Sequence, residues 1–248
     1  MSTAPLGHRE PELRGQTVAV IGGSAGIGFE TARRARIEGA SVILSGRNPE
    51  RLERAASELG ALSTSAFDAT EPTPLEQFFR NLPAPIDHVM VTAGRPHYGR
   101  LLDIELARRA LDESLLMMLQ VARHAAGKVR PGGTLLFMSG TGGRRPGVGL
   151  GIVSTLTAAT PAFTANLALE LAPIRVNLIA AGFVDTPLSA SLLGDQLENR
   201  RDQLRAKLPI RRVVTPVDVA ALAVHIMSNT ALTGATFDID GGQQLLDR

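Results

Sequence analysis

The stretch Ile21-Gly22-Gly23-Ser24-Ala25-Gly26-Ile27-Gly28 decides the fold of this chain. It follows a short apolar run and leads into a segment with helical spacing. A strand, a glycine-rich turn and a helix together let a diphosphate approach bare backbone, because the loop amides and the positive end of the helix favour an anion. A purely structural turn would not need three glycines at this spacing. We expect a dinucleotide to contact Gly22, Ser24, Gly26, Ile27 and Gly28.

Short apolar runs alternate with helix-length segments along the rest of the chain. Apolar or β-branched runs are typical of strands that are covered on both faces. The candidate strands are residues 17–21, 41–45, 63–67, 88–92, 134–139, 174–179 and 235–239. The candidate helices are residues 27–38, 49–59, 75–81, 101–128, 151–171 and 216–228. This alternation predicts an α/β fold: a doubly wound, Rossmann-like sheet of seven parallel strands with helices on both faces, in a single domain.

Composition narrows the class of protein. The chain has 248 residues, of which 44% are hydrophobic, enough for one core. Residues 1–14 are polar and Pro-rich, which predicts a flexible lead-in to a domain over residues 15–248 and not a signal peptide. The net charge is +2 and cysteine is absent, so we expect no nucleic-acid partner, no thiolate chemistry and no metal site. We find no run of about 18 uncharged apolar residues, so we expect a cytoplasmic protein without a membrane span.

The end of the second predicted strand reads Ser45-Gly46-Arg47-Asn48. An NAD-specific site would place a carboxylate here to hold the ribose hydroxyls. Arg47 would instead pair with a 2′-phosphate, and no acid stands at Gly46 to repel one. Arg47 and Asn48 are therefore expected cofactor contacts, and NADP(H) is favoured over NAD(H). The alternative is that Arg47 is a solvated residue at the start of the next helix.

Further motifs match one known family nearly end to end. They are Phe67-Asp68-Ala69, Thr92-Ala93-Gly94, Leu167-Ala168-Leu169-Glu170-Leu171-Ala172-Pro173 with Ile174-Arg175-Val176-Asn177, Ala181-Gly182 with Thr186, and Asp238-Ile239-Asp240-Gly241-Gly242. In these motifs and its glycine loop the chain resembles the short-chain dehydrogenases/reductases. Ile21 and Thr92 differ from the residues usual there. The resemblance implies that Asp68 contacts the adenine and Thr186 the nicotinamide amide, with Ala69, Ala93, Gly94, Gly182 and Val184 as further cofactor contacts.

The same resemblance exposes a departure at the positions that normally do the chemistry. The chain has one tyrosine, Tyr98, and two lysines, Lys128 and Lys207, so it contains no Tyr-x-x-x-Lys pair. Aligned with the family, the catalytic tyrosine, lysine, serine and asparagine fall at Val153, Thr157, Gly140 and Ser114. Valine cannot give a proton, and a threonine hydroxyl is too weak an acid to replace a tuned phenol near neutral pH.

Replacement proton donors are therefore candidates. Ser139 lies beside Gly140, and Thr157 keeps a hydroxyl at the lysine position. His97 and Tyr98 follow the fourth predicted strand, at the edge of the sheet where ligands bind in open α/β folds. The alternative for both is a loop that packs over the mouth of the pocket. The pair Arg144-Arg145 is a candidate for holding an anionic substrate.

Two helices carry further local signals. For the helix over 216–228, Thr215 is a capping residue, Pro216 suits the first turn, and Asp218 is placed to complete a capping box. In the helix over 151–171, Pro161 removes a donor and crowds the Thr157 carbonyl, which predicts a kink. The hydroxyls of Thr157, Thr160 and Thr164 are expected to satisfy the freed carbonyls.

Two functions follow from these residues. The first is an NADP(H)-dependent oxidoreductase that acts on a small carbonyl or hydroxyl compound with an atypical acid–base site. The alternative is a catalytically lapsed protein that binds NADP(H) as a sensor or partner subunit; a non-redox lyase ranks last. The resemblance also implies a homotetramer or homodimer, built through the helices at 101–128 and 151–171 and the last strand, and a substrate lid over residues 187–207.

Overall fold

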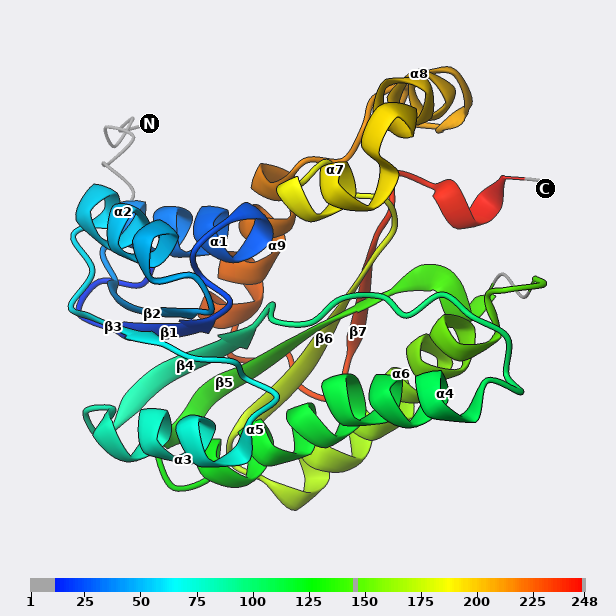
Figure 1. Ribbon diagram of the computed structural model, residues 1–248. Helices are drawn as coiled ribbons and strands as arrows, with labels where there is room; N and C mark the ends of the chain where they lie inside the picture. Colours follow the sequence, from blue (N-terminus) through cyan, green and yellow to red (C-terminus); the bar gives the residue numbers. More distant parts are fainter. Residues whose placement is uncertain (1–11, 145–146, 247–248) are drawn as a thin grey trace, which may run out of the picture.

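A seven-stranded parallel sheet forms the centre of the protein in the computed structural model, which describes residues 12–144 and 147–246 (Figure 1). The strand order is β3-β2-β1-β4-β5-β6-β7, so the direction of winding reverses between β1 and β4. The strands are β1 (Thr17–Ile21), β2 (Ser41–Gly46), β3 (Ser63–Ala66), β4 (Ile86–Val91), β5 (Val129–Gly140), β6 (Arg175–Ala181) and β7 (Thr236–Ile239). The predicted doubly wound, Rossmann-like fold in one domain is confirmed.

Helices cover both faces of this sheet (Figure 1). One face carries α1 (Gly26–Ile37), α2 (Pro49–Leu59) and α9 (Pro216–Ser228). The other carries α3 (Pro72–Asn81), α4 (Ile104–Leu111), α5 (Met117–Ala125) and α6 (Gly151–Glu170). Each layer closes its own apolar core against the sheet, which is why the central strands are buried on both sides.

The helix predicted over 101–128 is built from three pieces. Between α4 and α5 the chain forms a π-helical stretch, Asp112–Leu116. Such stretches interrupt the usual hydrogen-bond pattern and are frequent at functional sites. The substrate lid expected over 187–207 is also helical, as α7 (Pro187–Leu193) and α8 (Leu197–Lys207), which the sequence reading did not predict.

The local helix signals are largely confirmed. The Asp218 carboxylate accepts a hydrogen bond from the Thr215 backbone N–H at 2.8 Å, as the capping box predicts. Helix α6 continues through Pro161 as a single element. The Thr160 hydroxyl donates to the Thr157 carbonyl at 3.0 Å, which replaces the donor that Pro161 lacks. The same expectation is wrong for Thr157, whose hydroxyl donates to the Val153 carbonyl, and for Thr164, whose buried hydroxyl has no hydrogen-bond partner among the described residues.

One expectation about the chain as a whole needs correction, and another stays a prediction. Leu13 is fully buried and its N–H donates to the Glu38 carbonyl at 2.9 Å, so the domain begins before residue 15. Residues 1–11 of the expected lead-in lie outside the described residues. Among those described, α6 is long and apolar enough to cross a membrane, by length and composition alone, so the expectation of no membrane span stays a prediction. This helix packs Leu167 and Ala168 into the core beneath the sheet, as a core helix of a globular protein does.

Candidate active site

The glycine loop offers bare backbone at the carboxyl end of β1. Gly22 has a φ of +96° and Gly26 a φ of +54°, which favour glycine. A Cβ atom at Gly22 would lie 2.7 Å from the Ala93 nitrogen, and one at Gly28 would collide with the Gly22 carbonyl oxygen. Helix α1 begins at Gly26, and its N-cap residue Ala25 makes no side-chain cap hydrogen bond in the described structure. The first N–H groups of the helix therefore have no side-chain cap from Ala25, and backbone of this kind suits a diphosphate.

Thr92, at the end of β4, forms hydrogen bonds to the backbone of the glycine loop. Its hydroxyl donates to the Gly22 carbonyl at 3.1 Å and lies 3.3 Å from the Ile21 carbonyl. The backbone N–H groups of Thr92 and Ala93 also reach the Ile21 carbonyl, at 2.8 and 3.0 Å. Thr92 stands out in sequence only as a departure from the usual asparagine. In the structure it ties the end of β4 to the glycine turn.

At the end of β2, the guanidinium of Arg47 is largely exposed beside Asp68. The Arg47 side chain is 77% exposed, and its Nη1 lies 3.8 Å from Asp68 Oδ2. The Asp68 Oδ1 atom accepts hydrogen bonds from the backbone and hydroxyl of Thr70, at 3.0 and 2.8 Å. The Asn48 side chain caps α2 by accepting from the Arg51 N–H at 2.7 Å. A ligand at this edge would thus meet Arg47 and Asp68 side by side, while the Asn48 oxygen already serves the helix.

Ser24 and Gly46 pack closely in this corner. A Cβ atom at Gly46 would lie 2.8 Å from the Ser24 Oγ. A carboxylate side chain at position 46 would therefore have to displace Ser24 from the glycine loop. Ala69, next to Asp68, is buried in the core.

The connection from β6 to α7 closes the other side of the glycine loop. A Cβ atom at Gly26 would lie 3.5 Å from the Thr186 Cβ, so Thr186 borders the loop directly. The Thr186 Oγ1 accepts from the Ser189 N–H at 3.1 Å and caps α7. Val184 is buried and bridges to Val214. Gly182 packs against Asp240, where a Cβ atom would lie 2.6 Å from the Asp240 Cβ.

Several hydroxyl groups lie where α6 packs on the end of β5, and most of them donate their hydrogens to other groups of the protein. The Thr157 hydroxyl donates to the Val153 carbonyl of its own helix at 2.8 Å. The Ser154 hydroxyl donates to the Gly142 carbonyl at 3.2 Å. The Thr160 hydroxyl lies 2.8 Å from the Ser139 Oγ. The Thr160 hydroxyl has one hydrogen, which it shares between the Ser139 Oγ and the Thr157 carbonyl 3.0 Å away, so Ser139 keeps its own hydrogen for another partner.

The structure separates the two donors predicted on the loop after β4. The Tyr98 side chain is exposed. The His97 side chain is buried, and its Nε2 lies 3.2 Å from the Glu113 Oε2, without the alignment of a hydrogen bond. The Arg95 Nε lies 3.6 Å from the same oxygen. Glu113 sits in the π-helical stretch next to Ser114, and no sequence motif singled it out.

This loop also reaches the helix that carries the reaction positions. The Gly99 carbonyl accepts a hydrogen bond from the Ile152 N–H at 3.4 Å, directly before Val153. A Cβ atom at Gly94 would lie 3.8 Å from the Glu113 carbonyl oxygen. His97 therefore lies on a loop that runs from the cofactor edge of β4 to the start of α6.

Comparison with known proteins agrees with this arrangement. The family model described as Enoyl-(Acyl carrier protein) reductase matches residues 22–244. The short-chain dehydrogenase/reductase ATR9 of Stachybotrys chlorohalonatus is 30% identical, over 94% of this chain and 98% of its own length. The chain belongs to the short-chain dehydrogenase/reductase family.

Solved structures of short-chain dehydrogenases/reductases share its architecture. The MalC reductase/Diels-Alderase of Malbranchea aurantiaca superposes with a TM-score of 0.87 at 27% identity, covering 96% of this chain and 99% of that one. A small-chain dehydrogenase in complex with NADPH superposes with a TM-score of 0.80 at 27% identity, covering 93% of this chain and 99% of that one.

Three of the four family reaction positions, Gly140, Val153 and Thr157, are neighbours in this short-chain dehydrogenase/reductase. A Cβ atom at Gly140 would lie 3.5 Å from the Thr157 Cγ2, so the serine and lysine positions are neighbours. Ser114 donates its hydroxyl to the Ala110 carbonyl within the helix. Arg144, the anion candidate, instead donates to Asp238 of β7, through its Nη2 at 2.9 Å. Arg145 lies outside the described residues.

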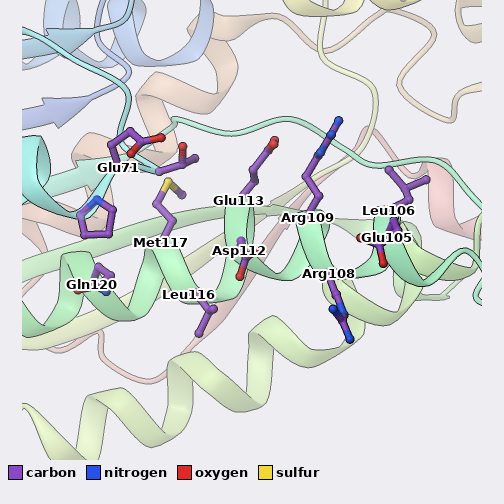
Figure 2. A pocket seen from close by; sticks show the side chains of 12 residues that line it. Glu71, Glu105, Leu106, Arg108, Arg109, Asp112, Glu113, Leu116, Met117 and Gln120 are labelled. Atoms are coloured by element: carbon purple, nitrogen blue, oxygen red, sulfur yellow. The ribbon is translucent and has the colours of Figure 1, made fainter.

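A cavity of about 800 Å³ lies along α4, the π-helical stretch and α5, beside the stretch that follows Asp68 (Figure 2). Both signs of charge line it, including Glu71, Arg109 and Glu113. Glu113 and Arg109 project to the same side of the helix, whereas Arg108 and Leu116 point to the opposite side (Figure 2). The cavity contains none of the four family reaction positions.

Proposed function

We propose that this protein is an NADP(H)-dependent oxidoreductase that acts on a small carbonyl or hydroxyl compound through an atypical proton-transfer site. The observation that carries the proposal is the glycine loop, where side chains at Gly22 and Gly28 would strike the backbone and the start of α1 faces the open turn. A site that excludes side chains at these points suits a diphosphate.

The cofactor would be held from three sides. The loop amides at residues 22–28 would bind the diphosphate, and Thr186 would lie at the nicotinamide end. Arg47 would pair with a 2′-phosphate, because its side chain is exposed and its only charged contact among the described residues is a long one, to Asp68 at 3.8 Å. The cofactor would supply the hydride for reduction of a carbonyl carbon. Family members of known structure with NADPH bound support this choice of cofactor.

The proton for the substrate oxygen needs a different source from the usual tyrosine. His97 is the donor we propose. To donate from Nδ1, His97 would act as the imidazolium: its Nδ1–H bond would break as the substrate oxygen gains the proton, which would leave a neutral ring. The Glu113 carboxylate, 3.2 Å from Nε2, would stabilise the positive charge before the transfer. Ser139 would hold the substrate oxygen with the hydroxyl hydrogen that Thr160 leaves free. Tyr98 and Thr157 are weaker candidates, since Tyr98 faces solvent and Thr157 donates to its own helix.

A second function is favoured by one observation. The hydroxyls of Ser154, Thr157 and Thr160 all donate to groups within the protein. Hydroxyl hydrogens that are already bonded within the protein are not available to a substrate. Such a site fits a protein that binds NADP(H) without turnover, as a sensor or partner subunit. Calorimetry tests both functions together. Micromolar NADPH binding is expected for both, and failure to bind NADPH or NADH would refute both. A panel of carbonyl substrates then separates the two functions. Oxidation of NADPH with any substrate supports the oxidoreductase, and its absence with all of them supports the protein without turnover.

The proposed assembly is a homotetramer or homodimer in the cytoplasm. The helices expected at the interface expose large apolar side chains: Leu111, Leu116 and Leu119 around the π-helical stretch, and Leu169 on α6. Exposed residues of this kind fit a contact between protomers. Light scattering after size exclusion tests the assembly, and a monomer at micromolar concentration would contradict it.

A further inference from the structure

Helices α7 and α8 form a segment, residues 187–207, that stands away from the sheet (Figure 1). Its apolar anchor is a small cluster in which Leu204 and Leu208 pack with Val213, against Phe183 and Leu246. This cluster is separate from the two main cores, and α8 buries a single side chain, Leu204. A segment with so few buried contacts opens at a low cost in free energy, so each polar contact to the body matters more.

Among the described residues, one ion pair joins α8 to the body of the protein. The Arg201 Nη2 donates to the Asp185 Oδ1 at 2.7 Å, with both side chains about three-quarters buried, at 24% and 27% exposure. The Arg201 Nη1 bonds Glu198 of the same helix. The buried Nε has no hydrogen-bond partner among the described residues. The guanidinium is therefore fixed between its own helix and the stretch that follows β6.

Asp185 lies in the stretch of backbone that separates α8 from the glycine loop. Its N–H donates to the Val214 carbonyl at 2.9 Å. The next residue, Thr186, borders Gly26, and the Ser189 hydroxyl donates to the Val184 carbonyl at 2.6 Å. A displacement of Asp185 would therefore move Thr186 relative to the glycine loop.

We propose that Arg201 is a positioning residue that, by holding Asp185, fixes residues 184–186 beside the glycine loop and slows the release of bound NADP(H). The proposal rests on the proposed cofactor, and it assigns to α8 a role in retaining that cofactor. Arg201 touches no reacting atom and acts through Asp185 and Thr186.

The test is the rate at which NADPH leaves the full-length protein, followed by its fluorescence after displacement with excess NADP⁺. Arg201→Met keeps the length of the side chain and removes the charge. Because partly buried, charge-assisted pairs are stronger than exposed ones, we expect release to accelerate about three- to tenfold. Asp185→Asn should have a similar effect, and the double variant should be no faster than the single ones.

The same helix provides a matched control. Arg205 pairs with Asp202 at 2.7 Å, but both residues belong to α8 and are exposed. Arg205→Met removes the same charge from the same helix and should leave the release rate within twofold of the wild type. An equal acceleration by Arg205→Met, or additive effects of Arg201→Met and Asp185→Asn, would overturn the proposal.

Hydrogen exchange on the free protein provides a readout that does not depend on the cofactor. Arg201→Met, and not Arg205→Met, should speed exchange of the Asp185 and Ser189 amides. If the wild type binds no NADPH, the proposed function fails and the retention role fails with it. If NADPH binds and neither its release nor the exchange responds to Arg201→Met, only the positioning role is overturned.

Discussion

The Thr160 hydroxyl of α6 shares its one hydrogen between the Ser139 Oγ, 2.8 Å away at the end of β5, and the Thr157 carbonyl that Pro161 leaves without a donor. One buried side chain thus repairs the helix and orients a hydroxyl at the sheet edge. Pro161 has no N–H to give to the Thr157 carbonyl, so this carbonyl needs another donor within one turn of the helix. The Thr160 hydroxyl is that donor.

Removing this hydroxyl should weaken the fold. Thr160→Val keeps the shape of the side chain but leaves the Thr157 carbonyl unpaired, so we expect a loss of about 1–3 kcal/mol in the free energy of unfolding. Urea denaturation measures it. Thr160→Ser, which keeps the hydroxyl, should recover most of the loss. An equally stable Thr160→Val protein would show that the carbonyl finds another donor.

Gly28→Ala should damage both folding and cofactor binding. The added Cβ collides with the Gly22 carbonyl oxygen, so the loop must shift, at a cost of about 1–3 kcal/mol. Thermal unfolding and calorimetry with NADPH report the two effects. Gly127→Ala is the matched control, since a Cβ atom there meets nothing within 4 Å. Unchanged NADPH affinity in Gly28→Ala would argue against the loop as the diphosphate site.

Arg47→Ala should weaken NADPH binding selectively. A lost charge-assisted contact is worth about 1.5–3 kcal/mol, which is roughly 10- to 150-fold in Kd. Affinity for NADH, which lacks the 2′-phosphate, should change by less than about threefold. Arg51→Ala, at an exposed site on α2, controls for net charge. Equal losses for both dinucleotides would refute the assignment of Arg47 to the phosphate.

The pH dependence of stability should reveal a buried histidine. Burial lowers the pKa of His88 from 6.5 to about 3, and its Nε2 lies 2.6 Å from the Gln16 Oε1. Between these two pH values the unfolded chain binds the proton and the folded one does not. Stability from this residue is therefore complete above pH 6.5 and falls on acidification towards pH 3, by up to about 1.4 kcal/mol per pH unit.

Denaturation of His88→Asn at several pH values isolates the contribution of His88 to the pH dependence of stability. The variant should be less stable at neutral pH, where its packing differs, yet its stability should fall less steeply with acid than that of the wild type. The exposed His225→Asn serves as the control and should keep the wild-type slope. Parallel curves for His88→Asn and the wild type would contradict the prediction.

If the carbonyl panel finds a substrate, the proton donor can be identified directly. We expect His97→Gln to lower kcat by about 10²–10⁴-fold, the usual contribution of a positioned acid. Glu113→Gln should lower it less and shift the pH profile, because Glu113 acts through His97. Tyr98→Phe should leave kcat unchanged. The reverse pattern would assign the donor to the exposed tyrosine.

Local sequence was enough to predict most of the fold. The strand β1 and the helices α2 and α9 begin and end where their apolar spacing and caps predict, since those signals act within a few residues. Helices α7 and α8 were missed because α8 is strongly charged and buries only Leu204, so no apolar stripe marks it. The interruption at Asp112–Leu116 likewise has no marker in the sequence.

By itself, the sequence determined the strand–turn–helix unit around Gly22 and Gly28 and excluded the usual tyrosine–lysine pair, because both depend on residue identity and short spacing. The tertiary structure decided which side chains meet: Thr160 with Ser139, His97 with Glu113, and Arg201 with Asp185. Each of these pairs joins separate elements, so its geometry depends on how the helices pack on the sheet. No spacing along the chain encodes that packing.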